Sequence, residues 1–218
     1  MERTSQIPGR FVVRISQDLG LQEVDGACRR ASACRLVCSL RDFSQDRGEV
    51  VTMKVLFTQR AYSSIVKECL AFPKTETGGI LVGRKTADSD FLIPFVIGSG
   101  PKAKRSQSRF TPDVSWQQEI LEGLFKRYAV NYLGSFHRHP GTYYQPSLRD
   151  YRNARKITSS PDWDVYEAIF PIAILNGGGI QIYPYYLSRK SKGFKPISWE
   201  IISNKHHLVR SALQRRKR

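Results

Sequence analysis

The sequence predicts an α+β domain in which a mixed β-sheet packs against helices in a layered arrangement. Two observations indicate this fold class. Short apolar runs of strand length alternate with amphipathic segments of helical period, and glycine or proline marks several of the boundaries between them. With 218 residues, of which 40% are hydrophobic, the chain is long enough for one such domain with a sizeable core and an extension.

The first predicted elements are a short strand and a helix. Residues 55–57 form either a strand or the lead-in to the helix that Thr58 caps. The helix runs to about Phe72, because Pro73 stops it. Its buried face follows the spacing i, i+3, i+4 and i+7 and consists of Tyr62, Ile65, Val66 and Cys69.

Two strands and a second helix follow along the chain. Residues 80–83 and 91–97 are predicted strands, and residues 99–109 form a basic, serine-rich loop. Ser115 is the expected N-cap of the second helix. The apolar stripe of this helix is interpreted as core packing and comprises Trp116, Ile120, Leu121, Leu124, Phe125 and Tyr128.

The last third of the domain is predicted to complete the sheet. A strand at residues 132–136 leads into a segment that contains two histidines, and a helix follows at residues 148–157. The remaining expected elements are a buried strand at residues 166–175, a turn at 176–179, a hairpin partner at 180–187 and a last strand at 196–202.

The N-terminal part of the chain differs from this pattern. Residues 1–52 are interpreted as an extension of unknown role, with strand-like sequence at residues 11–15 and weak helical spacing at residues 28–40. Met53 lies directly before the domain, so residues 1–52 are alternatively upstream sequence from a misassigned start. The sequence alone does not separate these two readings.

The net charge of +16 is unevenly distributed. Residues 188–218 hold ten Lys or Arg and one Glu, and the domain at residues 53–204 is expected to end in a basic tail at residues 205–218. Such a chain binds nucleic acid or acidic protein surfaces nonspecifically. Because no helix-turn-helix pattern or interleaved aromatic and basic motif is present, the sequence does not predict a dedicated nucleic-acid function.

The sequence carries no sign of membrane insertion or secretion. No apolar run approaches the roughly 18 residues that a spanning helix needs, and the first residues lack the apolar core of a signal peptide. We therefore expect a cytoplasmic protein without a membrane partner. The spacing of Cys34 and Cys38 has no second pair to complete a metal site, and ordinary reduced thiols are expected at Cys28, Cys34, Cys38 and Cys69.

The segment H-R-H-P-G-T-Y-Y-Q-P-S-L-R-D, residues 137–150, contains a candidate metal site. Side chains at i and i+2 of an extended segment point to the same face, so His137 and His139 can reach one ion together. Pro140 favours the extended backbone at His139. Two imidazoles and the Asp150 carboxylate make a three-ligand set for a catalytic zinc, with the fourth position left for water.

The end of this segment is also a predicted helix start. Ser147 at the N-cap and Asp150 three residues later form a capping-box pattern, which places Asp150 in the first helical turn. The positive end of the helix dipole favours an ionised carboxylate there, and an ionised carboxylate is what a divalent metal requires. Taken alone, H-x-H also fits two unrelated histidines, and S-x-x-D also fits a simple cap.

The joint pattern is far more specific than either half, because it arises by chance in on the order of one chain in ten thousand or fewer. It closely resembles the signature of the JAMM metalloprotease family, also called JAB or MPN-plus domains, in its bacterial or phage form. The resemblance covers about residues 53 to 187 and includes E-T-G-G-I-L-V-G at residues 76–83 and the segment at residues 98–113. Arg138 replaces the small residue common between the two histidines and should point away from the metal.

The resemblance implies a fold, a mechanism and a class of substrate. The fold is the three-layer, cytidine-deaminase-like JAB/MPN fold. The ligands of a Zn²⁺ ion are His137, His139 and Asp150, while Glu76 is the general acid and base and Ser147 donates a hydrogen bond to the oxyanion. The reaction is hydrolysis of a peptide or isopeptide bond after the C-terminal tail of a ubiquitin-like or sulfur-carrier protein. Activating or conjugating enzymes of the same system are the implied partners.

Two other functions compete with this reading. A non-catalytic MPN-type scaffold generally lacks one or more of the ligands, whereas this chain keeps all five positions. A basic nucleic-acid-associated protein with an incidental metal site is the second alternative. Metal content separates the enzyme from the scaffold, and salt-dependent nucleic-acid binding tests the second alternative.

Overall fold

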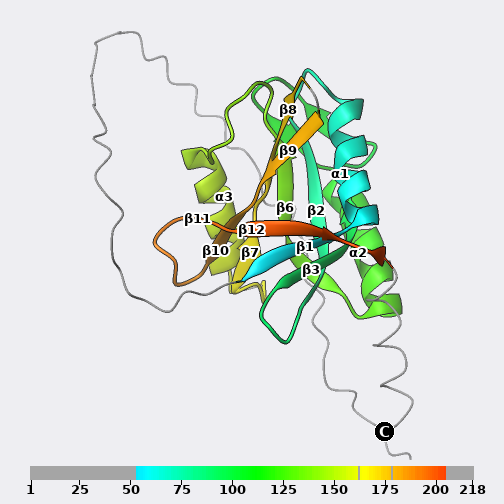
Figure 1. Cartoon of the computed structure of the whole chain (residues 1–218), viewed down its shortest axis with the longest axis vertical. Helices are drawn as coiled ribbons and strands as arrows, with labels where there is room; N and C mark the ends of the chain where they lie inside the picture. Colours follow the sequence, from blue (N-terminus) through cyan, green and yellow to red (C-terminus); the bar gives the residue numbers. More distant parts are fainter. Residues whose placement is uncertain (1–52, 162, 178, 205–218) are drawn as a thin grey trace, which may run out of the picture.

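A mixed β-sheet forms the centre of the computed structural model, which describes residues 53–161, 163–177 and 179–204 (Figure 1). Within these residues the sheet has ten strands. Eight of them follow one another across the sheet in the order β11 (Lys195–Pro196), β10 (Tyr185–Ser188), β7 (Glu167–Ile169), β6 (Asn131–Arg138), β2 (Thr77–Lys85), β3 (Phe91–Ile97), β1 (Lys54–Thr58) and β12 (Ser198–Ile202).

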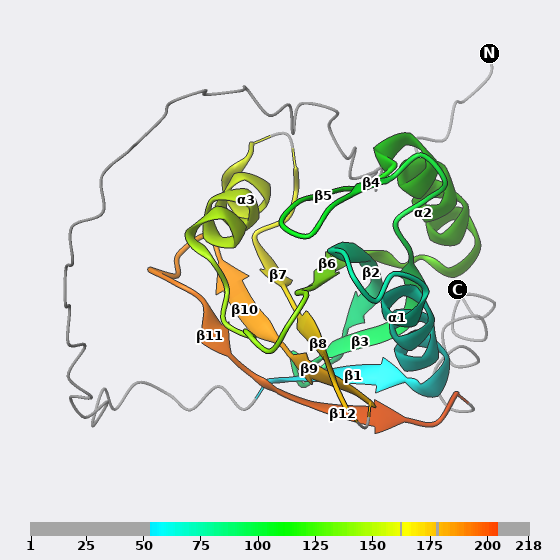
Figure 2. The ribbon, with the colours of Figure 1, turned by 90° about the horizontal axis from the view of Figure 1, so that it is seen from above.

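Two further strands extend the sheet at one end of β6. β8 (Ile172–Asn176) runs parallel to the C-terminal part of β6, and β9 (Gly179–Tyr183) pairs antiparallel with β8. A separate two-stranded hairpin consists of β4 (Lys104–Arg105) and β5 (Phe110–Thr111). In Figure 2 this hairpin lies between α2 (Val114–Tyr128) and α3 (Leu148–Ser159).

Helices cover both faces of the sheet and give three layers. The alternation of side chains along β2 shows this, because Leu81 packs with α1 (Gln59–Ala71) while Ile80 and Val82 pack with residues of α2 and α3. Ile65 and Cys69 are the buried centre of the α1 contact, and Leu121 is the buried contact of α2. The fold is therefore the helix–sheet–helix sandwich that was expected from the sequence.

Most predicted elements are confirmed, and several boundaries were wrong. β3 has the predicted bounds, but β2 is longer than residues 80–83, and residues 99–109 contain β4 rather than loop alone. The N-cap of α2 is Asp113 and not Ser115. Its carboxylate accepts a hydrogen bond from Trp116 N at 3.3 Å, and its own N–H donates to Ser99 O at 2.8 Å, which fixes the start of the helix two residues earlier.

The prediction of single strands at residues 166–175, 180–187 and 196–202 was wrong in each case, because each segment is divided into two strands. β7 and β8 are separated at Phe170 and Pro171, and β9 and β10 are separated at Pro184. Proline has no N–H with which to continue a strand ladder. β11 and β12 are separated at Ile197, whose N–H donates instead to Pro184 O at 3.1 Å.

The predictions for residues 1–52 and 205–218 fall on segments that lie outside the described residues, and the domain boundaries remain predictions. Among the described residues no helix has both the length and the apolar character to cross a membrane. Cys69 is a free, buried thiol, and burial raises its pKa to about 12, as expected for an unreactive core cysteine.

Candidate metal centre

The sheet places both histidines at the C-terminal end of β6. Backbone hydrogen bonds from the loop and strand beside it hold them there: His137 N donates to Pro171 O at 3.1 Å, and His139 N donates to Ala173 O at 3.0 Å. On the other side, β2 pairs antiparallel with β6, so Gly78 faces His137 and the start of β2 lies at the same end of the sheet. A strand with neighbours on both sides is a rigid support for a metal ligand.

Gly78 is required by this close pairing. A Cβ atom at this position would lie 2.3 Å from Phe136 O and 3.1 Å from His137 Cα. A side chain there would push the histidine strand away from β2. The plain structural role of this glycine therefore serves the site directly.

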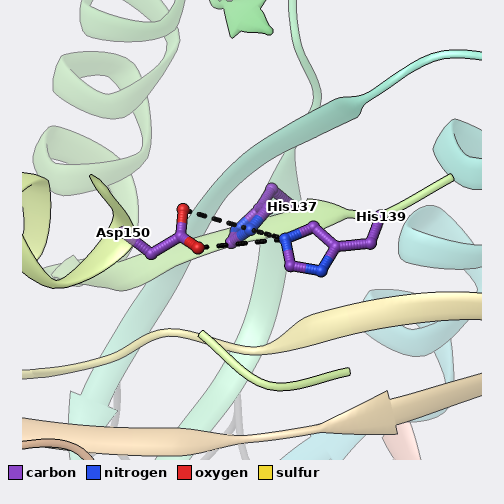
Figure 3. Close-up of side chains that lie close together, drawn as sticks. All are labelled: His137, His139 and Asp150. Atoms are coloured by element: carbon purple, nitrogen blue, oxygen red, sulfur yellow. Dashed lines mark hydrogen bonds and ion pairs between the residues drawn. The ribbon is translucent and has the colours of Figure 1, made fainter. Parts of the chain in front are cut away.

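Three donor atoms from two elements converge at this end of the sheet (Figure 3). His137 Nε2 lies 2.7 Å from His139 Nε2 and 3.4 Å from Asp150 Oδ1, and His139 Nε2 lies 3.9 Å from Asp150 Oδ2. Tetrahedral zinc with nitrogen and oxygen ligands at about 2.0–2.2 Å places those ligands roughly 3.3 Å apart. The three residues therefore fit a zinc ion in both chemistry and spacing.

Among His137, His139 and Asp150, two are oriented by hydrogen bonds to other residues. His139 Nδ1 lies 2.8 Å from Tyr143 O. Because a carbonyl only accepts, His139 carries its proton on Nδ1, which leaves the Nε2 lone pair facing the other donors. The Tyr143 ring also stacks on the His139 ring, with centroids 6.3 Å apart.

Asp150 is held by the predicted capping box of α3. Ser147 N and Ser147 Oγ both donate to Asp150 Oδ2, at 2.7 and 2.6 Å, and Asp150 N donates to Ser147 Oγ at 3.2 Å. These bonds engage Oδ2, whereas Oδ1 points at His137. Ser147 thus orients the carboxylate, and its hydroxyl faces Asp150 in this arrangement.

The surroundings of His137 favour the neutral form of its imidazole. Burial lowers the pKa of His137 to about 4, with the neighbouring Asp150 acting in the opposite direction and His139 in the same one. His137 is therefore neutral at physiological pH, and a neutral imidazole is the form that binds a metal ion.

Glu76 lies on the segment directly before β2 and lines the same cleft as His137 and Asp150. Its carboxylate is not one of the three clustered donors. Burial raises the pKa of Glu76 above its ordinary value, Asp150 also raises it, and His139 and Arg149 lower it. A carboxylate with a raised pKa suits proton transfer near neutral pH.

The backbone around Glu76 is fixed from two directions. Glu76 N donates to Ser106 O of the β4–β5 connection at 2.8 Å. Next to it, Thr77 Oγ1 donates to Glu68 Oε1 at 2.5 Å, and Arg105 Nε donates to Thr77 Oγ1 at 3.3 Å. Arg105 also forms an ion pair with Glu68 at 3.8 Å, so α1, β2 and β4 are joined at Thr77, the residue that follows Glu76.

Arg138 holds the segment before Glu76 from the other face of β6. As predicted, it points away from the two histidines. Its side chain is buried and donates to the carbonyls of Phe72 at 3.0 Å, Pro73 at 2.6 Å and Thr75 at 2.5 Å. The guanidinium therefore fixes the connection between α1 and β2, a contact that sequence reasoning did not anticipate.

A cleft with a volume of about 710 Å³ opens in front of these residues. Its floor is formed by the sheet, with Ile80 and Phe136, and its walls come from β5 and α3. This size lies within the range of binding clefts, roughly 300–1,000 Å³. The structure thus brings together the four residues predicted to act at the metal centre and places Ser147 beside Asp150.

A family profile for prokaryotic homologs of the JAB domain matches residues 58–188, which is more than half of the chain. The chain belongs to this prokaryotic JAB-domain family. The match confirms the family that the H-x-H-P and S-x-x-D motifs indicated, and the observed sandwich is consistent with the JAB fold.

Two curated relatives of this JAB domain carry functional names. The "CD-NTase/cGAS isopeptidase" of Enterobacter hormaechei subsp. hoffmannii (strain UCI 50) is 27% identical over 153 residues, covering 69% of this chain and 82% of the relative. The "Probable metalloprotease y4qB" of Sinorhizobium fredii (strain NBRC 101917 / NGR234) is 30% identical over 122 residues, covering 53% of this chain and 71% of the relative. One name is that of an isopeptidase and the other that of a probable metalloprotease.

A solved structure supports the fold alone. Protein DSY2949 from Desulfitobacterium hafniense, determined in solution, aligns with a TM-score of 0.55 at 19% identity and covers 70% of this chain and 97% of that protein. At that level of identity the likeness concerns the arrangement of helices and strands.

Proposed function

We propose that this JAB domain is a zinc-dependent hydrolase that cleaves the peptide or isopeptide bond after the C-terminal tail of a ubiquitin-like or sulfur-carrier protein. The observation that carries the proposal is the convergence of His137, His139 and Asp150, with Glu76 lining the same cleft. The names of the two relatives support the same reaction class.

In the proposed amide hydrolysis, Glu76 transfers the proton. Zinc, when bound, would act as a Lewis acid toward the scissile carbonyl and lower the pKa of the attacking water. Glu76 takes a proton from that water as its oxygen bonds to the carbonyl carbon. The same carboxyl then delivers the proton to the leaving nitrogen as the C–N bond breaks.

Ser147 is proposed to have two roles: it orients Asp150, and it donates a hydrogen bond to the transition state. Its hydroxyl donates to Asp150 Oδ2 in this structure, so donation to the developing oxyanion requires a rotation of the side chain. The loss of one such donor typically costs about 2–4 kcal/mol of transition-state stabilisation. A Ser147→Ala variant would also lose part of the cap, so zinc content must be measured beside the rate.

The substrate is proposed to be a protein tail joined to an amine. The resemblance to the JAMM family favours ubiquitin-like and sulfur-carrier proteins, and activating or conjugating enzymes of such a system are the proposed partners. The relative named a CD-NTase/cGAS isopeptidase adds a third kind of conjugate to test, one that contains a CD-NTase held by an isopeptide bond.

The test is cleavage of defined conjugates by zinc-loaded protein. A ubiquitin-like protein, a sulfur-carrier protein and a CD-NTase are each joined through the C-terminal carboxyl to a reporter amine. We expect one class to be hydrolysed, the rate to disappear with a chelator, and the rate to return with added zinc.

A matched variant separates the enzyme from the scaffold. Glu76→Gln keeps the size of the side chain and should keep the metal while it abolishes cleavage. Zinc-loaded wild-type protein that binds these proteins tightly and cleaves none of them would favour a scaffold. Cleavage that persists at full rate after metal removal would contradict the proposed chemistry.

A further inference from the structure

The cleft in front of the metal centre carries basic side chains on both walls. Arg109 lies beside β5 on one wall, and Arg149 and Lys156 lie on α3 in the other. All three are exposed. Within the part of the chain that the structure describes, none of the three forms an ion pair or a side-chain hydrogen bond.

The charge of the cleft is therefore not balanced by its own residues. Its acidic lining residues are Glu76 and Asp150, and both belong to the proposed chemistry. A divalent cation at the site would offset these two charges and leave the three basic groups uncompensated. A concave surface lined by one sign of charge concentrates ligands of the opposite sign.

The basic residues of α3 are spaced along one face of the helix. Arg149, Asn153 and Lys156 follow the spacing i, i+4 and i+7, and all three line the cleft. A helix rises about 1.5 Å per residue, so Arg149 and Lys156 are separated by roughly 10 Å along the axis. An extended peptide rises about 3.3 Å per residue and covers that distance in roughly three residues.

The arrangement has a direction relative to the metal centre. Arg149 directly precedes Asp150 in the first turn of α3, and its charge acts on Glu76. Lys156 lies about two turns farther along the helix. A tail that enters along α3 therefore passes Lys156 before it reaches Arg149 and the donor residues.

We infer that this cleft selects an extended substrate tail that is acidic, with carboxylate side chains at two positions about three residues apart. One carboxylate would lie beside Arg149 near the scissile bond, and the other beside Lys156, with Arg109 acting from the β5 wall. This inference rests on the proposed function, because it names the class of tail that the proposed hydrolase accepts. The same basic walls would also attract a nucleic-acid strand, and the test below separates the two.

The test uses synthetic tails with zinc-loaded, full-length protein. Peptides ending in Gly-Gly are joined through the terminal carboxyl to the ε-amine of a labelled lysine peptide. They carry Asp, Ala or Lys at two positions three residues apart, and the pair is moved along the tail one residue at a time. At low salt we expect kcat/KM to fall about tenfold from the best acidic tail to its lysine counterpart, with the difference shrinking at high salt.

A charge swap identifies the residues responsible. Lys156→Glu should reverse the preference for the distal position, so that the lysine tail becomes the better substrate. Arg152→Glu is the matched control, because Arg152 is an exposed residue of the same helix that does not line the cleft. It should leave the preference unchanged. Arg149 is not used for the swap, since its charge also acts on Glu76.

Each remaining outcome overturns the inference in a distinguishable way. Zinc-dependent cleavage of all tails at equal rates would overturn acidic selection and leave the proposed function intact. Absence of zinc-dependent cleavage with every tail would overturn the proposed function and the inference together. A single-stranded oligonucleotide that inhibits wild type but not Lys156→Glu, combined with indifference to tail charge, would assign the basic walls to nucleic acid.

Discussion

The two faces of the end of β6 hold their side chains in different ways. On one face, His137 and His139 have each other and Asp150 as neighbours, and their Nε2 atoms point at one another at 2.7 Å. On the opposite face, Arg138 is buried and donates to three backbone carbonyls. Adjacent residues of one strand therefore serve opposite purposes.

The difference is that the histidine face presents donor atoms to a cation, whereas the Arg138 face is held by hydrogen bonds within the protein. Imidazole nitrogens and a carboxylate that converge on one point are stabilised by a positive ion between them. Arg138 Nη1 and Nη2 already have carbonyl partners, while its buried Nε has none among the described residues. We therefore expect metal removal and pH to affect the face with His137 and His139. Changes at Arg138 should affect the stability of the fold and the position of Glu76.

The largest expected effect concerns Glu76. Glu76→Gln removes the proton acceptor and keeps the shape, so kcat/KM should fall by about two or more orders of magnitude. Zinc content and melting temperature should stay at wild-type values, because Glu76 is not among the clustered donors. Glu119→Gln, an exposed change on α2, is the matched control. Wild-type turnover by the Glu76 variant would remove this residue from the mechanism.

The second effect tests Arg138 as a positioning residue. Arg138→Met leaves three carbonyls without their donors and should lower the free energy of unfolding by about 2–4 kcal/mol. Because the segment before Glu76 loses its anchor, kcat should fall while KM and zinc content change little. Arg138→Lys keeps a single donor group and should restore part of both losses.

The two possible failures for Arg138 differ in meaning. A loss of zinc in Arg138→Met would show that this side chain supports the histidines rather than Glu76. Unchanged kcat in a destabilised but folded variant would show that its contribution is to stability alone. Urea denaturation and steady-state kinetics on the same preparations distinguish these results.

The third effect is the acid sensitivity of the metal-free protein. The unfolded chain protonates a histidine near pH 6.5, whereas folded His137 does so only near its lowered pKa of about 4. Between these values the unfolded state binds more protons, so stability is present above pH 6.5 and is lost as the pH falls toward 4. We expect a loss of about 1–2 kcal/mol by pH 5.

Thermal denaturation of chelator-treated protein as a function of pH measures this loss. His137→Gln removes this titrating group, so its curve should be flatter than that of the wild type. Added zinc should hold the wild-type histidine neutral and move the loss to lower pH. Identical pH slopes for wild type and His137→Gln would contradict the assigned burial effect.

The smallest expected effect is removal of residues 1–52. Every candidate site residue lies beyond Met53, so a chain beginning there should fold, bind zinc and hydrolyse the same substrate at the same turnover. A lower melting temperature with unchanged turnover would mean that the extension adds stability. A folded, zinc-loaded truncation without activity would show that residues 1–52 contribute to the site or to substrate binding.

The metal face could be predicted from the sequence because its information is local. His137, His139 and Asp150 fall within 14 consecutive residues, and strand alternation and helix capping fix how they point. The same alternation correctly predicted that Arg138 faces away. The position of Glu76 came from resemblance to a family motif, since only the antiparallel pairing of β2 and β6 brings it to this end of the sheet.

The partners of Arg138 could not be predicted, because they lie on a segment 63 to 66 residues away in the sequence. Every residue has a backbone carbonyl, so the residue type of the partner does not indicate such a hydrogen bond. Local competition explains another miss, since Asp113 and Ser115 are both good N-caps and the bond from Asp113 N to Ser99 O decides between them. Pro171 and Pro184 are visible in the sequence within long apolar runs, yet each run was predicted to form one continuous strand.

The most direct test of the central claim is the zinc content of purified protein and of Asp150→Asn, determined by elemental analysis beside the cleavage assay. Ser147 remains the N-cap of α3, and the asparagine amide oxygen can still accept from Ser147 N, so the fold is retained while the charged ligand is lost. We predict about one zinc per wild-type chain, and little zinc or activity in Asp150→Asn. Wild-type protein that is folded, zinc-free and fully active would contradict the account.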